Sequence, residues 1–563
     1  MHLGRRAWLA AWNSASTAQT EREAFREAMR GSKFEIPGSD REFAQRIADG
    51  VGGAALLHDV GHPPFSHVLE GVFHTLSHAW RASGARHLTL AAEHSQDDAG
   101  ELVGHLLEHS NRPFHEVAGY ALARQILVEC GLDRELHELI ETILMPPAHD
   151  GSWASALHGL VDSEFDVDRL DYLMRDASRC GTEFGAIDAA RLIQSFELHV
   201  LAGGEFWIAP GLRARSAVET LLLQRTQSYR WITFHPRVIG TNLALCRAVE
   251  MLVAPRIEDV FQEESSGALP IEDAPWEDIN YLTVREGAVS KLLTREGGNG
   301  GVHSLVREHQ AELQAGADDG RLLEKLKLAW AEATIEQGSK DGDYQRLRTY
   351  LDVVLFRRKR FVSAWKTDEE YATVCDGLVE GGLSDQVQQA LADVGENHKA
   401  NDHVTRRIEE QKQAFAERFG SGDAVSVVSD LLSMLLLDRS SRNDLAQLLA
   451  GAEGVPQGFW EFEVIQFTTV KERGKLLRLF SDGKLVRLDR VSPLVRSLIE
   501  LDKLQTSVYA FYFITDPSGI TNWSFRDSLR ARLIKELPSF IYRRYKQEVE
   551  AMIEGDGLDY LAE

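Results

Sequence analysis

The sequence predicts a mainly α-helical protein with one small β-hairpin and a small α+β region near its C-terminus. Over residues 45–75 and 95–180, apolar residues recur at steps of three and four, which is the spacing of one helix face. Strand-type runs of aromatic and β-branched residues occur over residues 197–211 and again between residues 459 and 515. Long helical patterns with few short strands favour the mainly α class.

The first strand-type run, residues 197–211, predicts a short hairpin. Val200, Phe206 and Ile208 alternate with other residues on either side of a Gly-Gly pair. Glycine suits a tight turn because it adopts positive φ at no steric cost. We therefore expect two strands joined at this pair.

A long helical pattern follows over residues 216–253, and it contains Pro236. Proline lacks a backbone N–H, so we expect a kink or a break beside His235. Residues 260–300 then turn polar and glycine-rich, which marks a boundary or a mobile loop. Residues 303–450 show the pattern of charged helices.

The chain has 563 residues, more than one compact core usually contains. We expect three regions: a helical core over 1–255, a helical accessory region over 256–455, and a small α+β lobe over 456–563. The lobe contains the second strand-type run and closes with a C-terminal helix.

The overall charge and the cysteines limit the class of protein. Lys and Arg number 62 and Asp and Glu 86, a net charge of −24, which disfavours non-specific binding to nucleic acid or to an anionic membrane. No apolar run approaches ~20 residues, so no transmembrane helix is expected. The four cysteines are scattered without C-x-x-C spacing, which fits reduced thiols and a cytoplasmic protein.

The stretch LLHDVGHPPFSH, residues 56–67, carries the densest set of reactive side chains. His58 and Asp59 offer an imidazole and a carboxylate to one divalent metal. His62 and His67 add two imidazoles, a group that suits proton transfer or contact with a phosphate. The glycine and the two prolines break the preceding apolar run. We therefore expect the His-Asp pair near the end of a buried helix, facing a cavity.

A second cluster, FDVDRLDYLMRD, spans residues 165–176. On a helix, Asp168, Tyr172 and Arg175 share one face at i, i+4 and i+7. A solvated charged face would show the same pattern. A metal held by one histidine and one aspartate still lacks ligands, however. Asp168 can add a carboxylate, and Arg169 can clamp a phosphate.

Taken together, these segments resemble the HD-domain phosphohydrolases, in the branch of deoxynucleoside triphosphate (dNTP) triphosphohydrolases that includes bacterial dGTPases and the mammalian SAM-and-HD-domain enzyme. That branch carries LLHDxGHxPFSH, matched by Leu56–His67, and D-x-D-R-x-D-Y-x-x-R-D, matched by Asp166–Asp176. It also carries an acidic-then-RLI segment, here CGTEFGAIDAARLI, and a late helix with an arginine and an aromatic-His pair, here LLLQRTQSYRWITFH. The resemblance covers residues 2 to about 255 and implies an HD-domain helical core there.

The resemblance implies one divalent metal. The family's ligand order, H…HD…D, maps onto His58, Asp59 and Asp168, with His2 of MHLGRRAWLA as the first histidine. Two nitrogens and two carboxylates suit Mn²⁺, Fe²⁺ or Mg²⁺. The family carries a further segment with a phosphate-contacting arginine before this histidine. We therefore expect either a start codon assigned too late or an incomplete site.

The remaining roles also come from the resemblance. His62 and His67 match active-site histidines, and His94 matches a histidine that pairs with a carboxylate, here Glu70. An ordinary hydrogen-bonded core histidine remains the other interpretation of His94 and of His235. The positions that match substrate contacts are Arg169 (facing phosphate), Tyr172, Asp176, Arg225 and His235.

The expected activity is attack at the α-phosphorus of a dNTP, which releases a deoxynucleoside and triphosphate. The resemblance also implies a homo-oligomer. Two alternatives stay open. One is an HD phosphohydrolase or phosphodiesterase that acts on another nucleotide. The other is a catalytically weak nucleotide-binding module that regulates the C-terminal lobe.

Overall fold

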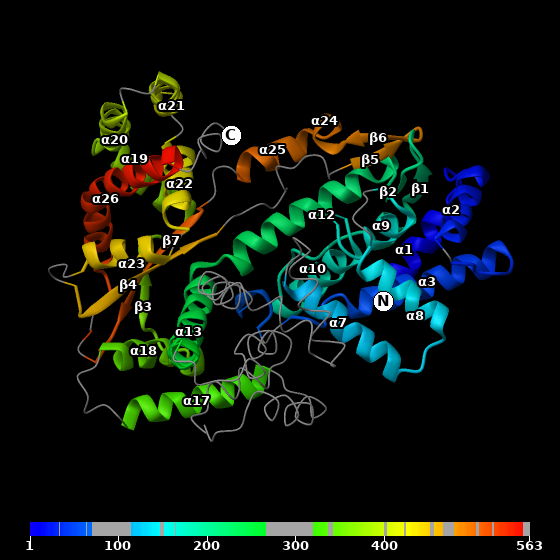
Figure 1. Ribbon diagram of the computed structural model, residues 1–563, viewed down its shortest axis with the longest axis horizontal. Coiled ribbons are helices and arrows are strands. Elements are labelled where there is room, and N and C mark those ends of the chain that lie inside the picture. Colours follow the sequence, from blue (N-terminus) through cyan, green and yellow to red (C-terminus); the bar gives the residue numbers. More distant parts are fainter. Residues whose placement is uncertain are drawn as a thin grey trace. The chain divides into compact units, whose positions relative to one another are not determined.

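The protein is mainly α-helical with small antiparallel sheets, as the sequence predicts (Figure 1). In the described part of the chain, no helix combines the length and the apolarity needed to cross a membrane. The computed structural model describes residues 1–32, 34–62, 65–69, 114–146, 151–163, 165–265, 319–335, 342–398, 402–420, 424–437, 439–450, 455–465, 478–502, 506–518, 520 and 523–554.

The chain divides into two compact units. Unit 1 consists of Met1–Arg230, Leu245–Ile335 and Val470–Leu498. Unit 2 consists of Trp231–Ala244, Glu336–Thr469 and Ile499–Glu563. The three regions expected from the sequence remain a prediction.

Unit 1 is built around a bundle of helices. It opens with α1 (His2–Trp12), α2 (Gln19–Gly31) and α3 (Asp40–Leu57). The later helical elements that begin or continue in this unit are α7 (Phe114–Glu129), α8 (Arg134–Leu144), α9 (Trp153–His158), α10 (Val167–Cys180), α11 (Ala189–Gln194), η1 (Leu212–Ala214), α12 (Arg215–Ser228), η2 (Tyr229–Thr233), α13 (Pro236–Ser265), α17 (Asp319–Ile335), α24 (Leu488–Val491) and α25 (Pro493–Asp502).

Helix α3 is fixed at its start by its own sequence. The hydroxyl of Ser39 accepts a hydrogen bond from the N–H of Glu42, and the Glu42 carboxylate accepts one from the N–H of Ser39 at 2.7 Å. This reciprocal pair is a capping box, which satisfies two N–H groups that a helix start leaves open. Farther along, the indole of Trp8 in α1 donates to the carbonyl of Ala44 at 2.8 Å, so α1 and α3 pack as one layer.

The predicted hairpin is present. Strands β1 (Phe196–Val200) and β2 (Phe206–Pro210) pair antiparallel, with Val200 opposite Phe206. Gly203 and Gly204 have φ of +116° and +83°, so glycine is needed in this turn. A second hairpin of unit 1 joins β5 (Arg478–Ser481) to β6 (Lys484–Arg487).

The long helical pattern is broken where Pro236 predicts. Helix α12 ends at Ser228, a π-helical turn η2 follows, and α13 begins at Pro236. The first position of a helix suits proline because the N–H that proline lacks has no intrahelical partner there.

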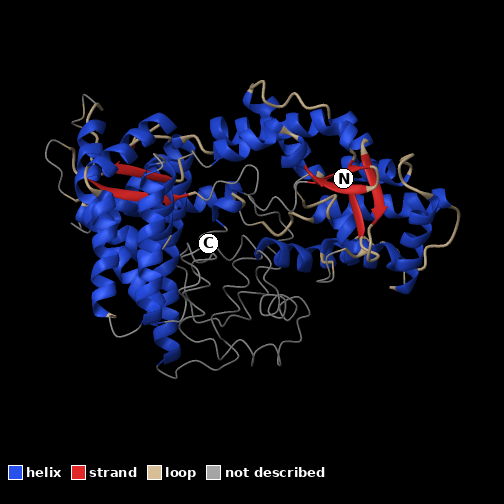
Figure 2. Cartoon of the chain, turned by 90° about the horizontal axis from the view of Figure 1, so that it is seen from above, coloured by secondary structure: helices blue, strands red, loops and turns tan. Residues whose placement is uncertain are grey.

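Unit 2 combines helices with a three-stranded sheet. Strand β7 (Val508–Ile514) lies between β3 (Phe361–Ser363) and β4 (Gly458–Val464), and every residue of β7 is buried. The strands are short and few among the helices (Figure 2). The helices of this unit are α18 (Gly342–Phe356), α19 (Asp368–Glu380), α20 (Leu383–Asn397), α21 (Asp402–Gly420), α22 (Ala424–Leu435), α23 (Arg439–Leu448) and α26 (Arg526–Glu554).

Strand β3 differs from the sequence expectation, because it lies inside the stretch that reads as charged helices. It has three residues, too few for a period-two pattern to stand out. Pairing with β7, which is distant in the sequence, makes it a strand.

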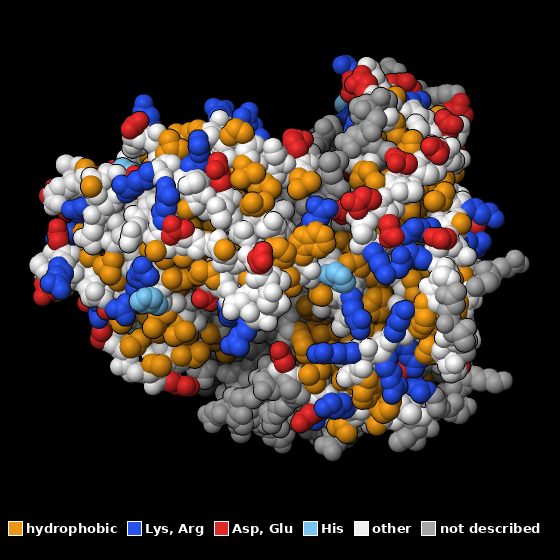
Figure 3. Space-filling model, turned by 180° about the vertical axis from the view of Figure 1, so that it is seen from behind, with side chains coloured by type: hydrophobic (Ala, Val, Ile, Leu, Met, Phe, Trp, Pro, Cys, Tyr) orange, Lys and Arg blue, Asp and Glu red, His pale blue; other side chains and the backbone are white. Residues whose placement is uncertain are grey.

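On the face shown in Figure 3, acidic and basic side chains are interspersed, so this face carries no single block of negative charge.

Candidate metal centre and histidine cluster

Three of the predicted metal ligands meet in unit 1. His58 directly follows α3 as its C-cap residue, Asp59 comes next, and Asp168 lies in the first turn of α10. Nε2 of His58 is 3.4 Å from Oδ1 of Asp59 and 3.9 Å from Oδ1 of Asp168. One ligand atom from each of the three residues lies within 4.8 Å of the others. The fold therefore brings this His-Asp pair to the distant aspartate, at the end of a helix, as predicted.

The start of α10 sets the place of Asp168. The carboxylate of Asp166 caps the helix and accepts hydrogen bonds from the N–H groups of Arg169 (2.6 Å) and Ser163 (2.9 Å). Burial raises the pKa of Asp166 to about 6, although the charge of Arg169 opposes that rise. With this cap, Asp168 falls in the first turn, next to the end of α3.

Arg169 is already engaged at this helix start. Its guanidinium contacts the Asp166 carboxylate and the carbonyl of Ser163, and it lies 3.8 Å from the carboxylate of Asp162. Its role as a phosphate clamp remains a prediction, because a phosphate would have to compete with these acceptors.

The charges around the three ligands depend strongly on one another. Burial raises the pKa of Asp59, but a hydrogen bond with His62 and nearby imidazoles outweigh burial and leave the pKa below its usual value. Burial also raises the pKa of Asp168; His58 opposes this rise, the negative charge of Asp59 adds to it, and the net shift is upward. A divalent cation would relieve the repulsion between these two carboxylates.

The donor set fits a divalent ion. Two carboxylate oxygens and one imidazole nitrogen suit a hard or borderline metal. Nδ1 of His58 is buried, and within the described residues it makes no hydrogen bond. A buried imidazole nitrogen of that kind is expected to bind a metal or a partner just outside the ligand set.

His2, the predicted first ligand, is the first residue of α1 and is exposed. The beginning of α1 lies against α3: a Cβ at Gly4 would lie 3.2 Å from Val51 and 3.4 Å from Ala55. Among the residues described, the group that contains His58 and whose ligand atoms lie within 4.8 Å of one another consists of His58, Asp59 and Asp168; a second such group is His62, His67 and His115. His2 as a fourth ligand remains a prediction.

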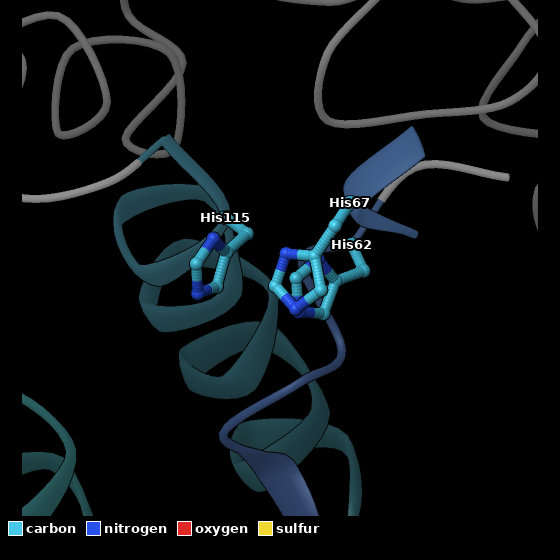
Figure 4. Close-up of side chains that lie close together, drawn as sticks. All are labelled: His62, His67 and His115. Carbon is cyan, nitrogen blue, oxygen red and sulfur yellow. The ribbon is translucent and has the colours of Figure 1, made fainter. Parts of the chain in front are cut away.

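A cluster of three histidines adjoins the metal set (Figure 4). His62 and His115 stack, with ring centroids 4.1 Å apart and planes 16° apart. His67 meets His62 edge-on at 4.4 Å and His115 at 5.5 Å. Nε2 of His62 is 3.3 Å from Oδ1 of Asp59, so the cluster and the metal set are continuous.

The stacking limits what the cluster can bind. An imidazole nitrogen binds a metal through a lone pair in its ring plane. The planes of His62 and His115 are nearly parallel, so one ion cannot lie in both planes in this arrangement. The cluster therefore suits proton transfer or hydrogen bonding to a phosphate, for which imidazole has the right pKa range.

The glycine of the HDVGH segment makes this arrangement possible. A Cβ at Gly61 would lie 2.2 Å from the nitrogen of Gly119 and 2.3 Å from the carbonyl oxygen of His115. Such distances are closer than any real Cβ contact, so only glycine lets the loop approach the backbone of α7. Helix α7 then delivers His115 onto the face of His62.

Sequence reasoning missed His115 and gave the third histidine role to His94. His94 and Glu70, its predicted partner, lie outside the described residues. The signal for His115 was present in FHEVAGYALARQIL, residues 114–127, where a His-Glu pair opens a helical apolar pattern.

The loop that carries His67 has an unusual backbone. Phe65 and Ser66 have φ of +58° and +52°, the left-handed region that favours glycine. Side-chain crowding there costs about 1–2 kcal/mol per residue. Leu69 is fully buried and anchors the end of the loop in the core of unit 1.

Arg225 and Tyr172, two predicted substrate contacts, meet through a residue that the sequence did not single out. The hydroxyls of Tyr172 and Tyr229 are 3.3 Å apart, and the Arg225 guanidinium lies 5.5 Å from the Tyr229 ring centroid. Burial raises the pKa of Tyr172, and Tyr229 adds to the rise, so its hydroxyl stays protonated. The π-helical turn begins at Tyr229, and such turns are frequent at functional sites.

The last two predicted contacts, Asp176 and His235, pair with neighbouring residues in the sequence. Asp176 is about half exposed and pairs with Arg175 at 3.1 Å. His235 belongs to unit 2, is exposed, and accepts a hydrogen bond at Nδ1 from the N–H of Arg237 at 3.2 Å. Substrate contact by either residue remains a prediction.

Comparisons with known proteins give partial matches. No protein-family model matches the chain. An uncharacterized protein of Methanocaldococcus jannaschii is 29% identical over 198 residues, 35% of this chain and 32% of that protein. An HD domain-containing protein of Acanthamoeba polyphaga mimivirus is 28% identical over 160 residues, 27% of each. The chain thus spans about a third or less of the length of these curated relatives.

Among solved structures, a phosphohydrolase from Bacteroides thetaiotaomicron aligns over 90% of this chain and 86% of its own, at 15% identity and a TM-score of 0.38. A likeness of that degree carries no argument about function. The sequence similarity to an HD domain-containing protein and the meeting of His58, Asp59 and Asp168 are the two findings that bear on the class of this protein.

Proposed function

We propose that the chain is a metal-dependent phosphohydrolase of the HD type and that it cleaves dNTPs to a deoxynucleoside and triphosphate. The observation that carries the proposal is the meeting of His58 and Asp59, at the end of α3, with Asp168 of α10. The similarity to an HD domain-containing protein supports the class. The dNTP substrate rests on the resemblance of the motifs.

The metal would be held by His58, Asp59 and Asp168, with His2 as the proposed fourth ligand. A divalent ion at this place supplies Lewis acidity toward a phosphoryl group. The neighbouring side chains have three further tasks: to bind the phosphate chain, to orient the reacting group and to move protons.

Proton movement falls to the histidine cluster. When water attacks the α-phosphorus and the bond to the 5′-oxygen breaks, the water loses a proton and the leaving oxygen gains one. An imidazole can accept the first proton, and an imidazolium can give the second. His62 is the best placed of the three, because it contacts Asp59 and both of the other rings. His67 and His115 can then restore its proton or hydrogen-bond the phosphate.

Phosphate binding falls to Arg225 and Tyr172. Arg225 is buried, and a buried guanidinium is a strong anion partner. The Tyr172 hydroxyl remains a neutral donor, because its pKa is raised. Both groups meet Tyr229, so they act from one place in unit 1.

A second candidate is an HD phosphohydrolase that acts on another nucleotide with a shorter phosphate chain. The observation that favours it is the engagement of Arg169 by Asp166 and Ser163. This engagement leaves fewer cationic groups for a triphosphate. The third candidate, which the sequence leaves open, is a nucleotide-binding module with weak turnover.

One assay separates the three. The protein is loaded with Mn²⁺, Fe²⁺ or Mg²⁺ and incubated with each dNTP, with nucleoside monophosphates and with cyclic nucleotides, and the products are resolved by ion-exchange chromatography. Deoxynucleoside plus triphosphate supports the main proposal. Monophosphate plus pyrophosphate, or turnover of monophosphates or cyclic nucleotides alone, overturns it. Nucleotide binding without turnover supports the regulatory module.

A further inference from the structure

The loop that carries His67 is held from outside by a residue 254 positions beyond Phe65 in the chain. Oδ1 of Asp319, the first residue of α17, accepts a hydrogen bond from the N–H of Phe65 at 3.0 Å. We propose that Asp319 is a positioning residue that fixes the loop and thereby the ring of His67. The catalytic part of this inference rests on the proposed function.

The loop needs such a support because its own backbone does not favour the conformation. Phe65 and Ser66 both have positive φ, which neither side chain favours. Strained residues of this kind persist when surrounding contacts over-determine them, and they cluster at functional sites. The hydrogen bond to Asp319 falls on the first of the two.

The other end of the loop is also tied. The thiol of Cys246 in α13 contacts the carbonyl of Val68 at 3.0 Å, and Leu69 is fully buried. His67 thus lies between two fixed points, Phe65 and Val68. It is exposed, but its ring lies edge-to-face with that of His62, with the ring centroids 4.4 Å apart. Release of one fixed point would let His67 leave this contact.

A carboxylate at the start of a helix has an ordinary alternative role. Asp319 would stabilise α17 by its charge alone, since negative groups are favourable at helix N-termini. That role predicts an effect confined to α17. The positioning role predicts an effect at Phe65, in a different segment, and the two are separable by hydrogen exchange.

The test compares full-length Asp319→Ala, Asp319→Asn and Asp319→Ser with the parent chain. Asparagine keeps an oxygen at the same reach, so it should preserve the contact. Serine is one bond shorter, so it removes the contact with Phe65. It still favours a helix start, so this variant tests the proposal even if the alanine variant folds poorly. Glu324→Ala, which removes an exposed carboxylate from the same helix, is the matched control.

The first readout is amide exchange in the peptide that contains Phe65, measured by mass spectrometry without substrate. We expect at least fivefold faster exchange in the alanine and serine variants, and parent-like exchange in the asparagine and Glu324→Ala variants. Unchanged exchange in Asp319→Ser, or faster exchange confined to α17, overturns the inference. This readout stands even if the chain has no dNTP activity.

The second readout is kinetic. With a substrate identified by the activity assay, Asp319→Ser should lower kcat about tenfold, with KM within about twofold, and should change the pH profile of kcat. Asp319→Asn should restore kcat. A released loop with unchanged kcat and pH profile would show that Asp319 holds the loop without positioning a catalytic group.

Discussion

Nε2 of His62 lies 3.3 Å from Oδ1 of Asp59, and this contact joins the histidine cluster to the candidate metal set. The same oxygen, Oδ1 of Asp59, lies 3.4 Å from Nε2 of His58, and ligand atoms of His58, Asp59 and Asp168 lie within 4.8 Å of one another. A proton on His62 and a cation in the metal set would both interact with one carboxylate. This coupling is the basis of the first prediction.

His62→Gln should abolish most of the turnover and leave metal binding intact. Loss of a general acid or base typically lowers the rate by about 10²–10⁴-fold. The test measures kcat together with metal content by plasma mass spectrometry. His137→Gln is the control, because that histidine pairs with Glu141 in α8 at 3.0 Å and should have no part in turnover. Equal loss of metal and activity in His62→Gln would instead make His62 a ligand.

Gly61→Ala should destabilise the protein and displace α7. The new Cβ would lie 2.2–2.6 Å from backbone atoms of His115 and Gly119, which cannot move aside as a side chain can. Overpacking of this kind costs about 1–3 kcal/mol. Gly31→Ala is the control, since a Cβ at Gly31 meets nothing within 4 Å. Urea unfolding measures both free energies. Equal unfolding free energies for the two variants would contradict the close approach of α7.

Tyr229 should hold Arg225 and Tyr172 in place. Tyr229→Phe removes the hydroxyl pair and keeps the ring beside the guanidinium, whereas Tyr229→Leu removes both. We expect a small rise of KM in the first variant and a larger rise in the second. A double-mutant cycle with Tyr172→Phe should give a coupling of about 1 kcal/mol in unfolding free energy. Coupling near zero would show that the two hydroxyls do not interact.

His199 should make the stability of unit 1 depend on pH. Burial lowers its pKa, but hydrogen bonds and charges from Glu197 (3.2 Å) and Glu21 (2.8 Å) outweigh burial, so the net pKa is raised. A raised pKa means that the folded state binds the proton more tightly than the unfolded state. The stabilisation is therefore complete below the unfolded pKa of about 6.5 and is lost as pH rises through the folded value.

The measurement is the unfolding free energy between pH 5.5 and pH 9, for the parent chain and for Glu21→Gln. Glu21→Gln should cost about 2 kcal/mol at low pH, the size of a hydrogen bond to a charged group. The difference between the two chains should shrink as pH rises. A difference that grows with pH would contradict a protonated His199.

The sequence predicted the parts of the site that a short motif contains. The His-Asp pair, Asp168 on its helix and the break at Pro236 follow from residue type and spacing alone. The sequence did not predict that His115 belongs to the site, because its proximity to His62 depends on a close backbone contact between two glycines from separate segments. A local sequence pattern does not predict tertiary contacts between distant segments.

The same limit explains the other differences. Strand β3 is a strand only through its pairing with β7, and Asp319 matters only through the loop that it contacts. In the sequence, Tyr229 is an ordinary residue of a helical pattern. In the structure, it begins the π-helical turn, and its hydroxyl lies beside that of Tyr172. In each case the sequence supplies the residue, and the tertiary fold supplies its partner.

The most direct test of the central claim is the metal content of the chain after exhaustive dialysis and reloading. The parent chain should hold about one tightly bound divalent ion. Asp168→Ala should lose at least about tenfold in metal affinity, together with turnover, because the carboxylate is one of few ligands. Asp171→Ala, on the same helix, should bind metal as the parent does. An Asp168→Ala chain that keeps its metal and its activity would contradict the account.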